Sequence, residues 1–179
     1  MPTRKRESWF VLGFLLLAVI IGLSISLLSP TAHIKYAEEP LHFQEEDFKV
    51  QSAEAAIEVG SETLADVESE FGKGRFLGMS TVYEPPSRDF RLRFPKNQDT
   101  VWIFDTVHPG YFTSRGISVG DPIDKVVKAY GENYSKVTLD GDRERYDLVY
   151  GSSSEGTVTF HCQNGVVSRI VVSRHPATK

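Results

Sequence analysis

The 179-residue sequence is poor in the residues and motifs that mark most catalytic and metal sites. It has one cysteine, Cys162, so an internal disulfide framework and a Cys-x-x-Cys zinc site are excluded. The serines at 152–154 lie outside any Gly-x-Ser-x-Gly motif. No glycine-rich loop precedes a helix in the way phosphate binding requires, because Gly72-Lys73-Gly74 follows an expected helix and resembles its C-cap. We therefore expect no cofactor and no bound metal.

An excess of positive charge is also missing. The chain has 20 Lys and Arg against 24 Asp and Glu, which gives a formal net charge of −4. A general nucleic-acid binder needs a basic surface that contacts phosphates. The charge balance therefore argues against a nucleic-acid partner.

One long hydrophobic run stands near the N-terminus, from Trp9 to Leu28. Its length matches the roughly 20 residues that cross a hydrocarbon core. We expect residues 1–8 to be a basic cytoplasmic N-terminus and residues 9–28 to be an uncleaved transmembrane anchor that holds the protein to the membrane. Because Arg4, Lys5 and Arg6 precede the run, the rest of the chain would be extracytoplasmic. A removed signal peptide is the alternative, although its apolar core is usually shorter and no Ala-x-Ala site follows here.

Residues 29–54 form an acidic stretch with few apolar side chains. High charge and low hydrophobicity favour a solvated, weakly ordered segment. We expect an acidic linker there, in which Leu41, Phe43, Phe48 and Val50 would let part of the segment pack, and a frayed tail at residues 174–179.

Two segments carry the same helix signature. Residues 120–131 read GDPIDKVVKAYG, in which Asp121 is a good N-cap, Pro122 suits the first helical position and Gly131 suits the C-terminal cap. Residues 60–72 read GSETLADVESEFG, in which Thr63 and Asp66 fit a capping box. Both segments have apolar residues at helical spacing, so the sequence predicts two equivalent helices.

Alternating apolar and polar residues follow each expected helix. Phe90, Leu92 and Phe94 alternate with Arg91 and Arg93, which indicates a half-buried strand. Short connections favour antiparallel pairing, and the Asn-Gly pair at 164–165 predicts a tight hairpin. The predicted fold class is α+β, with two tandem repeats, each a short helix packed on an antiparallel β-meander, after the N-terminal transmembrane helix. Repeat one spans 55–107, the connector 108–116 and repeat two 117–173.

The repeated pattern resembles a known group of proteins. It reads Ile-x-Val-Gly, a helix, then an aromatic residue and Gly, followed in repeat two by Tyr150-Gly151, TVTF at 157–160 and the Asn-Gly hairpin. This pattern resembles bacterial envelope modules of the SmpA/OmlA type and the tandem-repeat fold of the β-lactamase-inhibitor proteins. The resemblance covers about residues 56–173, and it implies a short helix packed on an antiparallel sheet in a module that binds other proteins. It differs from the outer-membrane lipoproteins in having two units and no lipid-attachment cysteine.

Candidate catalytic residues are few. Cys162 is adjacent to His161, but neighbours on a strand point to opposite faces, so we expect Cys162 to be a core residue. Asp105 and His108 have a spacing that suits a catalytic pair or a metal, but no third ligand has a recognisable spacing. We therefore do not expect an enzyme. An envelope hydrolase built on these three residues remains an alternative.

The candidate binding residues lie around one basic cluster. The cluster consists of Arg88, Arg91, Arg93 and Lys96, and we expect Arg91 and Arg93 to project from one sheet face. Aromatic anchors near it would be Trp102, Tyr111 and Phe112, since aromatic residues are enriched in binding hot spots. The sequence favours a membrane-anchored, non-enzymatic protein-binding module of the cell envelope, with an envelope protein as its partner. A sensor of a small ligand or an anionic cell-wall polymer is the alternative.

Overall fold

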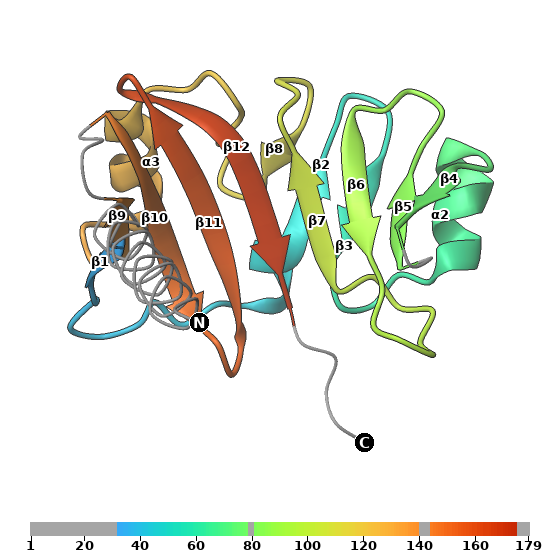
Figure 1. The fold of residues 1–179 in the computed structure, drawn as a ribbon, viewed down its shortest axis with the longest axis horizontal. Coiled ribbons are helices and arrows are strands. Elements are labelled where there is room, and N and C mark those ends of the chain that lie inside the picture. The colour runs from blue at the N-terminus through green and yellow to red at the C-terminus, as the bar shows by residue number, and fades with distance from the viewer. Residues whose placement is uncertain (1–31, 79–80, 140–143, 175–179) are drawn as a thin grey trace, which may run out of the picture. The chain divides into compact units, whose positions relative to one another are not determined.

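The main element of the fold is a nine-stranded antiparallel sheet. The computed structural model describes residues 32–78, 81–139 and 144–174, and the strand order in this sheet is β1-β9-β10-β11-β12-β7-β6-β5-β4 (Figure 1). Its strands are β1 (Ala32–Lys35), β4 (Arg75–Leu77), β5 (Val82–Glu84), β6 (Phe90–Arg93), β7 (Ile103–Thr106), β9 (Ser135–Leu139), β10 (Arg145–Ser152), β11 (Gly156–Gln163) and β12 (Val166–Ser173).

A smaller sheet and short helices complete the described fold. The small sheet has the order β3-β2-β8, with β2 (Lys49–Gln51), β3 (Ala56–Glu58) and β8 (Phe112–Thr113). The helical elements among the described residues are α2 (Leu64–Phe71), α3 (Ile123–Tyr130) and the 3-10 turn η1 (Glu45–Phe48). In Figure 1, α3 and the small sheet lie behind the nine-stranded sheet.

The predicted fold class is wrong. In place of α+β helix-on-meander repeats after a transmembrane helix, the described chain is mostly antiparallel β-sheet, with two α-helices of eight residues each. The strands of both halves join in one sheet, because β12 pairs with β7 from Ile170↔Thr106 to Ser173↔Ile103. This pairing hides two strand edges that separate units would expose.

The expected single-pass membrane topology is also corrected. In the described ranges, we find no helix with the length and apolar character needed to cross a membrane. The run from Trp9 to Leu28, on which that topology rested, lies outside the described residues.

Local signals explain where the helices begin and end. The capping box at α2 is confirmed: Asp66 N–H donates to Thr63 Oγ1 (3.3 Å), and Thr63 N–H donates to Asp66 Oδ2 (3.0 Å). At α3 the cap is Pro122 and not the expected Asp121. The Asp121 carboxylate instead accepts from Ser118 N–H (2.7 Å) in the preceding turn, so the helix begins one residue later than its N-cap signal predicts.

Both halves contain the same buried tyrosine contact. Tyr83 O–H donates to the carbonyl of Gly72 (2.6 Å), and Tyr150 O–H donates to the carbonyl of Gly131 (2.9 Å). Each glycine follows its helix with a positive φ, which leaves a backbone carbonyl for the tyrosine on a nearby strand. The contact fixes the end of each helix against the nine-stranded sheet.

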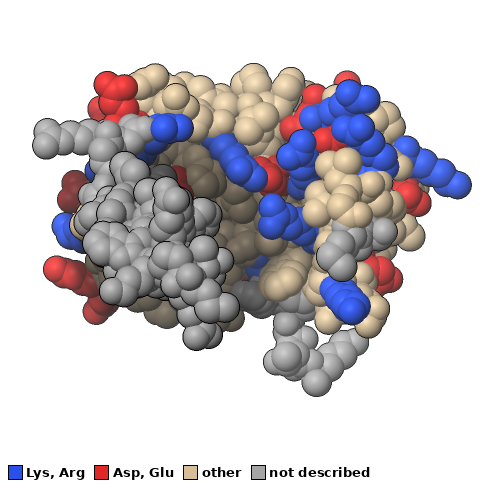
Figure 2. All heavy atoms as spheres, viewed as in Figure 1, with Lys and Arg blue, Asp and Glu red and all other residues tan. Residues whose placement is uncertain are grey.

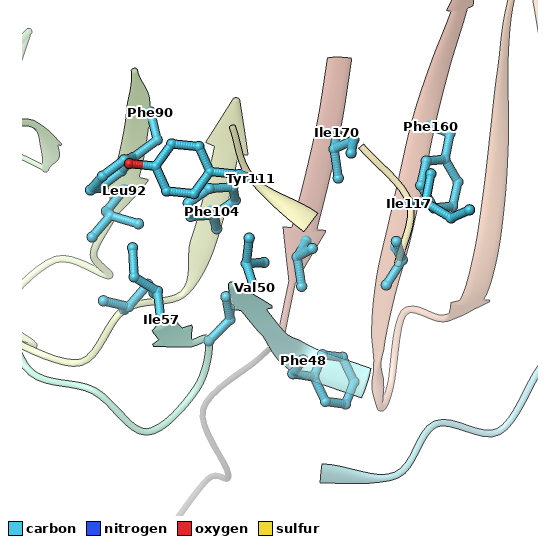
Figure 3. Packing of buried hydrophobic residues seen from close by; sticks show 14 of the residues in the cluster. Phe48, Val50, Ile57, Phe90, Leu92, Phe104, Tyr111, Ile117, Phe160 and Ile170 are labelled. Carbon is cyan, nitrogen blue, oxygen red and sulfur yellow. The ribbon is translucent and has the colours of Figure 1, made fainter. Parts of the chain in front are cut away.

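Part of the expected acidic linker belongs to the core. Phe48, at the end of η1, is buried, as are Val50 and Ile57 of the small sheet, and all three belong to one core cluster with Phe104 and Ile170 of the large sheet (Figure 3). The expectation that Phe48 and Val50 let part of the linker pack is thus confirmed, whereas the weakly ordered segment predicted from composition is corrected where η1 and β2 form. Its charge count was misleading because one carboxylate, Asp47, is itself buried.

Candidate binding face

The face of the nine-stranded sheet that points away from the core is the candidate binding surface, here called the open face. Buried side chains such as Leu92, Phe104 and Phe160 point to the core, and the residues between them on each strand point the other way. No element of the described ranges packs on this open face (Figure 1). The sheet therefore presents a broad surface built on rigid strands.

Ionisable side chains cross the open face in one line, here called the charged row. Seven neighbouring strands each contribute one member, at positions that are opposite or diagonal in the pairing register. The row consists of Asp147 (β10), His161 (β11), Arg169 (β12), Asp105 (β7), Arg91 (β6), Glu84 (β5) and Arg75 (β4).

At the centre of the row, Arg169 holds Asp105 with two hydrogen bonds. Arg169 Nε lies 2.6 Å from Asp105 Oδ1, and Nη2 donates to Oδ2. The guanidinium covers the carboxylate, which is why Asp105 is only 7% exposed on a face with no covering layer. The hydrogen bond to Asp105 raises the pKa of Arg169, against the opposing effect of burial. Such a two-point pair fixes the orientation of both groups.

Glu84 lies between two arginines at the other end of the row. Arg75 Nε lies 2.5 Å from Glu84 Oε2, and Arg91 Nε lies 3.1 Å from Glu84 Oε1. The hydrogen bond from Arg75 lowers the pKa of Glu84, burial opposes this, and the bond from Arg91 adds to the lowering. Glu84 is therefore a fixed anion that holds both guanidinium groups in place.

The row ends at β10 with an aspartate–histidine pair. His161 Nδ1 lies 2.6 Å from Asp147 Oδ1, and both side chains are one-third exposed. The pair lines a hollow of about 330 Å³ together with Val137 and Tyr146.

Three predicted residues supply positive charge beyond the row. Arg88, Arg93 and Lys96, here called the free cations, are exposed, and they make no ion pair within the part of the chain that the structure describes. Arg91 and Arg93 share the open face, as predicted. Figure 2 shows Lys and Arg gathered over the half of the visible face formed by β4 to β7. This half is locally positive although the whole chain is acidic.

The structure separates Tyr111 and Phe112 from this basic cluster, whereas Trp102 is next to it, because the Trp102 backbone N–H donates to the Arg93 carbonyl (2.8 Å). Tyr111 is 8% exposed and packs against Phe90 and Phe104 in the core (Figure 3), where burial raises its pKa to about 12. Phe112 is 43% exposed but belongs to β8 of the small sheet. Trp102 is partly buried next to β7. The structure does not bring Tyr111 and Phe112 onto the open face.

The candidate catalytic residues are not assembled together. Asp105 is bound by Arg169, whereas His108 accepts a hydrogen bond from Gly110 N–H at Nδ1 (3.1 Å) and lies 4.0 Å from Asp89. Cys162 is 2% exposed, and burial raises its pKa to about 12, so the thiolate is disfavoured. The prediction that Cys162 is a core residue is confirmed. No group of three or more potential metal ligands occurs in residues 32–78, 81–139 and 144–174.

Sequence reasoning missed five members of the charged row, Arg75, Glu84, Asp147, His161 and Arg169. Each occupies an outward position on a strand, which alternation could have identified except at Arg169, where a register shift between β11 and β12 interrupts the alternation. Their arrangement in one line depends on the pairing of strands distant in sequence, and no local motif encodes that register.

Comparison of the chain with models of protein families, with curated proteins and with solved structures found no match.

Proposed function

We propose that the protein is a non-enzymatic protein-binding module and that the open face is its binding surface. The observation that carries the proposal is the charged row, together with the free cations, on a sheet face that no described element covers. The sequence resemblance to protein-binding modules points in the same direction.

The ion pairs of the row favour binding because they fix its side chains in advance. Association costs entropy for each flexible side chain that becomes ordered. Arg75, Arg91 and Arg169 are already held by Glu84 and Asp105, so less of this cost remains. Their remaining N–H groups can still donate to a partner, since a guanidinium has five donors.

The distribution of charge indicates the kind of partner. Complementary charge increases association rates and suppresses wrong partners more than it increases affinity. The free cations Arg88, Arg93 and Lys96 make the β4–β7 half positive. The partner surface would therefore be acidic where it meets this half.

Two substitutions test the proposal without disturbing the core. Arg93→Glu reverses a charge that has no ion-pair partner in the described ranges, and Thr159→Tyr places a bulky strand-forming residue in the middle of the open face. Lys128→Glu, on the exposed side of α3, is the control with the same change of charge as Arg93→Glu.

The assay is capture of partner proteins from an extract of the source organism, quantified by mass spectrometry. We expect one specific protein to be captured at least tenfold less by Arg93→Glu and Thr159→Tyr, and equally by Lys128→Glu and the wild type. Thermal melts would show that all variants are folded. Equal capture by the wild type and the three variants would show that the open face is not the binding surface.

A second candidate is binding of a small ligand in the hollow beside Asp147 and His161. Its volume of about 330 Å³ lies at the lower end of the range for ligand pockets. A ligand that binds the native state raises the melting temperature. A thermal-shift screen with small anions and wall fragments, repeated on His161→Gln, would support this candidate only if the shift disappears in the variant.

A further inference from the structure

A small hollow lies on the open face where the charged row meets the turn between β5 and β6. Its volume is about 170 Å³, and its charged lining residues are Arg88, Arg91, Arg169, Asp89 and Asp105. The volume is below the roughly 300–1,000 Å³ of small-molecule sites. The hollow therefore suits one inserted side chain better than a whole ligand.

Several arginine N–H groups around this hollow have no hydrogen-bond acceptor among the described residues. Arg169 uses Nε and Nη2 on Asp105, which leaves Nη1, and Arg91 uses Nε on Glu84, which leaves both terminal nitrogens. The Arg88 side chain has no hydrogen bond or ion pair within the described residues, and only its backbone N–H donates, to the Pro85 carbonyl (3.0 Å). The donors that remain belong to guanidinium groups, whose planar fork matches the two oxygens of a carboxylate.

The charges that line the hollow favour an anion. Three guanidinium groups and two carboxylates leave a balance of one positive charge. An unmodified protein partner supplies anions as the carboxylates of Asp and Glu, whereas a phosphate group carries about −1.5 to −2 at neutral pH. Because attraction to a positive balance grows with the charge of the anion, inorganic phosphate is the competitor that the test must distinguish.

We propose that this hollow is a subsite for the carboxylate of an Asp or Glu side chain that projects from the protein partner. The inference rests on the proposed function, because it specifies what the partner inserts. Arg88 and Arg91 would bind the carboxylate, and Asp105 and Glu84 would act as positioning residues for Arg169 and Arg91.

The test needs no knowledge of the partner, because short peptides can supply the side chain. The probes are the capped tripeptides acetyl-Gly-Asp-Gly-amide and acetyl-Gly-Asn-Gly-amide, which differ by one carboxylate against its isosteric amide. The readout is the NMR signal of the arginine Nε–H groups during titration at constant ionic strength. Arg115 supplies an internal control, since it also pairs with a buried aspartate, Asp47, but lies away from the hollow.

We expect saturable shifts of Arg91 and Arg169 with the Asp peptide, binding at least about tenfold weaker with the Asn peptide, and no shift of Arg115. Equal shifts with both peptides would overturn the proposal. Tighter binding of inorganic phosphate than of the Asp peptide would also overturn it, because the hollow would then be a general oxyanion site.

Variants locate the effect in the hollow. Arg91→Gln keeps Glu84 paired with Arg75, and Arg88→Asn suits a residue with φ of 63°, because Asn tolerates that conformation. Each should weaken binding of the Asp peptide about tenfold. Lys128→Gln, which removes a positive charge from the exposed side of α3 and lies outside the hollow, should leave it unchanged. Unchanged affinity in Arg91→Gln would refute the subsite.

The outcome is separable from that of the proposed function. Peptide binding that fails while Arg93→Glu still abolishes partner capture would refute the carboxylate subsite and leave the open face as the binding surface. If peptide binding depends on Arg91 but partner capture is unchanged in Arg93→Glu and Thr159→Tyr, the subsite is supported. The claim that the whole open face is the binding surface is then refuted.

Discussion

The ion pair between Arg115 and Asp47 allows a quantitative test of how η1 is held to the rest of the fold. Arg115 Nε lies 2.7 Å from Asp47 Oδ1, and Nη2 lies 3.1 Å from Oδ2. The guanidinium also lies 4.8 Å from the centre of the Tyr130 ring. The perturbation is Arg115→Met, which keeps an apolar stem over the ring and removes the charge.

The expected loss of unfolding free energy follows from the burial of the Asp47 carboxylate, which has no ion-pair partner once Arg115 is replaced. Asp47 is 7% exposed, and its remaining hydrogen bond in the described ranges is from Gln44 N–H (3.0 Å). Removing one member of a buried ion pair costs roughly 3–5 kcal/mol. The Arg115 side chain is 29% exposed, so solvent already screens part of the pair, and we expect a loss of about 2–4 kcal/mol. For a folded unit of this size, this corresponds to a fall in Tm of about 5–12 °C.

The loss of stability caused by Arg115→Met should depend on pH in a defined direction. Burial acts to raise the pKa of Asp47, but the bonds from Arg115 and from Gln44 N–H leave it below the ordinary value of 3.8. The pair therefore contributes stability above that value, and this contribution is lost as pH falls through the lowered folded-state pKa. In Arg115→Met, burial acts with less opposition and raises the pKa, so the variant loses stability as pH rises above about 4. The difference between the two proteins should be largest near pH 7 and smallest near pH 3.

The assay is urea unfolding at pH 7 and at acid pH, with Arg174→Met as the matched control. Arg174 also makes two hydrogen bonds to a carboxylate, Glu45, and lies 4.8 Å from an aromatic ring. Glu45 is largely exposed, so this variant should lose much less stability. Equal losses in the two variants, or a loss in Arg115→Met that does not change with pH, would show that an unpaired buried charge at Asp47 is not the cause of the destabilisation.

Three further predictions concern the core. Gly74→Ala should destabilise the fold by about 1–3 kcal/mol in urea unfolding, because a Cβ there would lie 2.4 Å from both the carbonyl oxygen of Glu84 and the Tyr83 ring; an unchanged midpoint would contradict the close contact. Tyr150→Phe should cost about 1–3 kcal/mol, because the Gly131 carbonyl loses its donor, and an effect near zero would mean that water replaces it. Cys162 should react with a thiol reagent only in denaturant, and rapid labelling of the native protein would contradict its burial.

Local features of the fold were predictable from the sequence, and non-local pairing was not. The capping box at Thr63, the Asn164-Gly165 turn and the alternation of β6 depend on neighbouring residues, and the structure contains all three. The join between β12 and β7 gives no local signal, because it depends on the register of strands about 65 residues apart.

The candidate site shows the same limit. The basic residues of β6 and its turns were predicted, since they are adjacent in sequence. Asp105 and Arg169 are 64 residues apart, and Asp47 and Arg115 are 68 apart, so composition alone placed Asp47 in a solvated linker. A charged side chain can be buried where the fold gives it a partner of opposite charge and is otherwise solvated. Only the folded chain shows which residue that partner is.

The most direct test of the open face is site-specific photocrosslinking in the source organism. A photoreactive amino acid would replace Thr159 or Arg93 on the open face, and Lys128 on α3 as the control. The account predicts that the two open-face positions crosslink the same protein and that position 128 does not. Crosslinking of that protein from position 128 alone, or equally from all three positions, would contradict the claim that the open face is the binding surface.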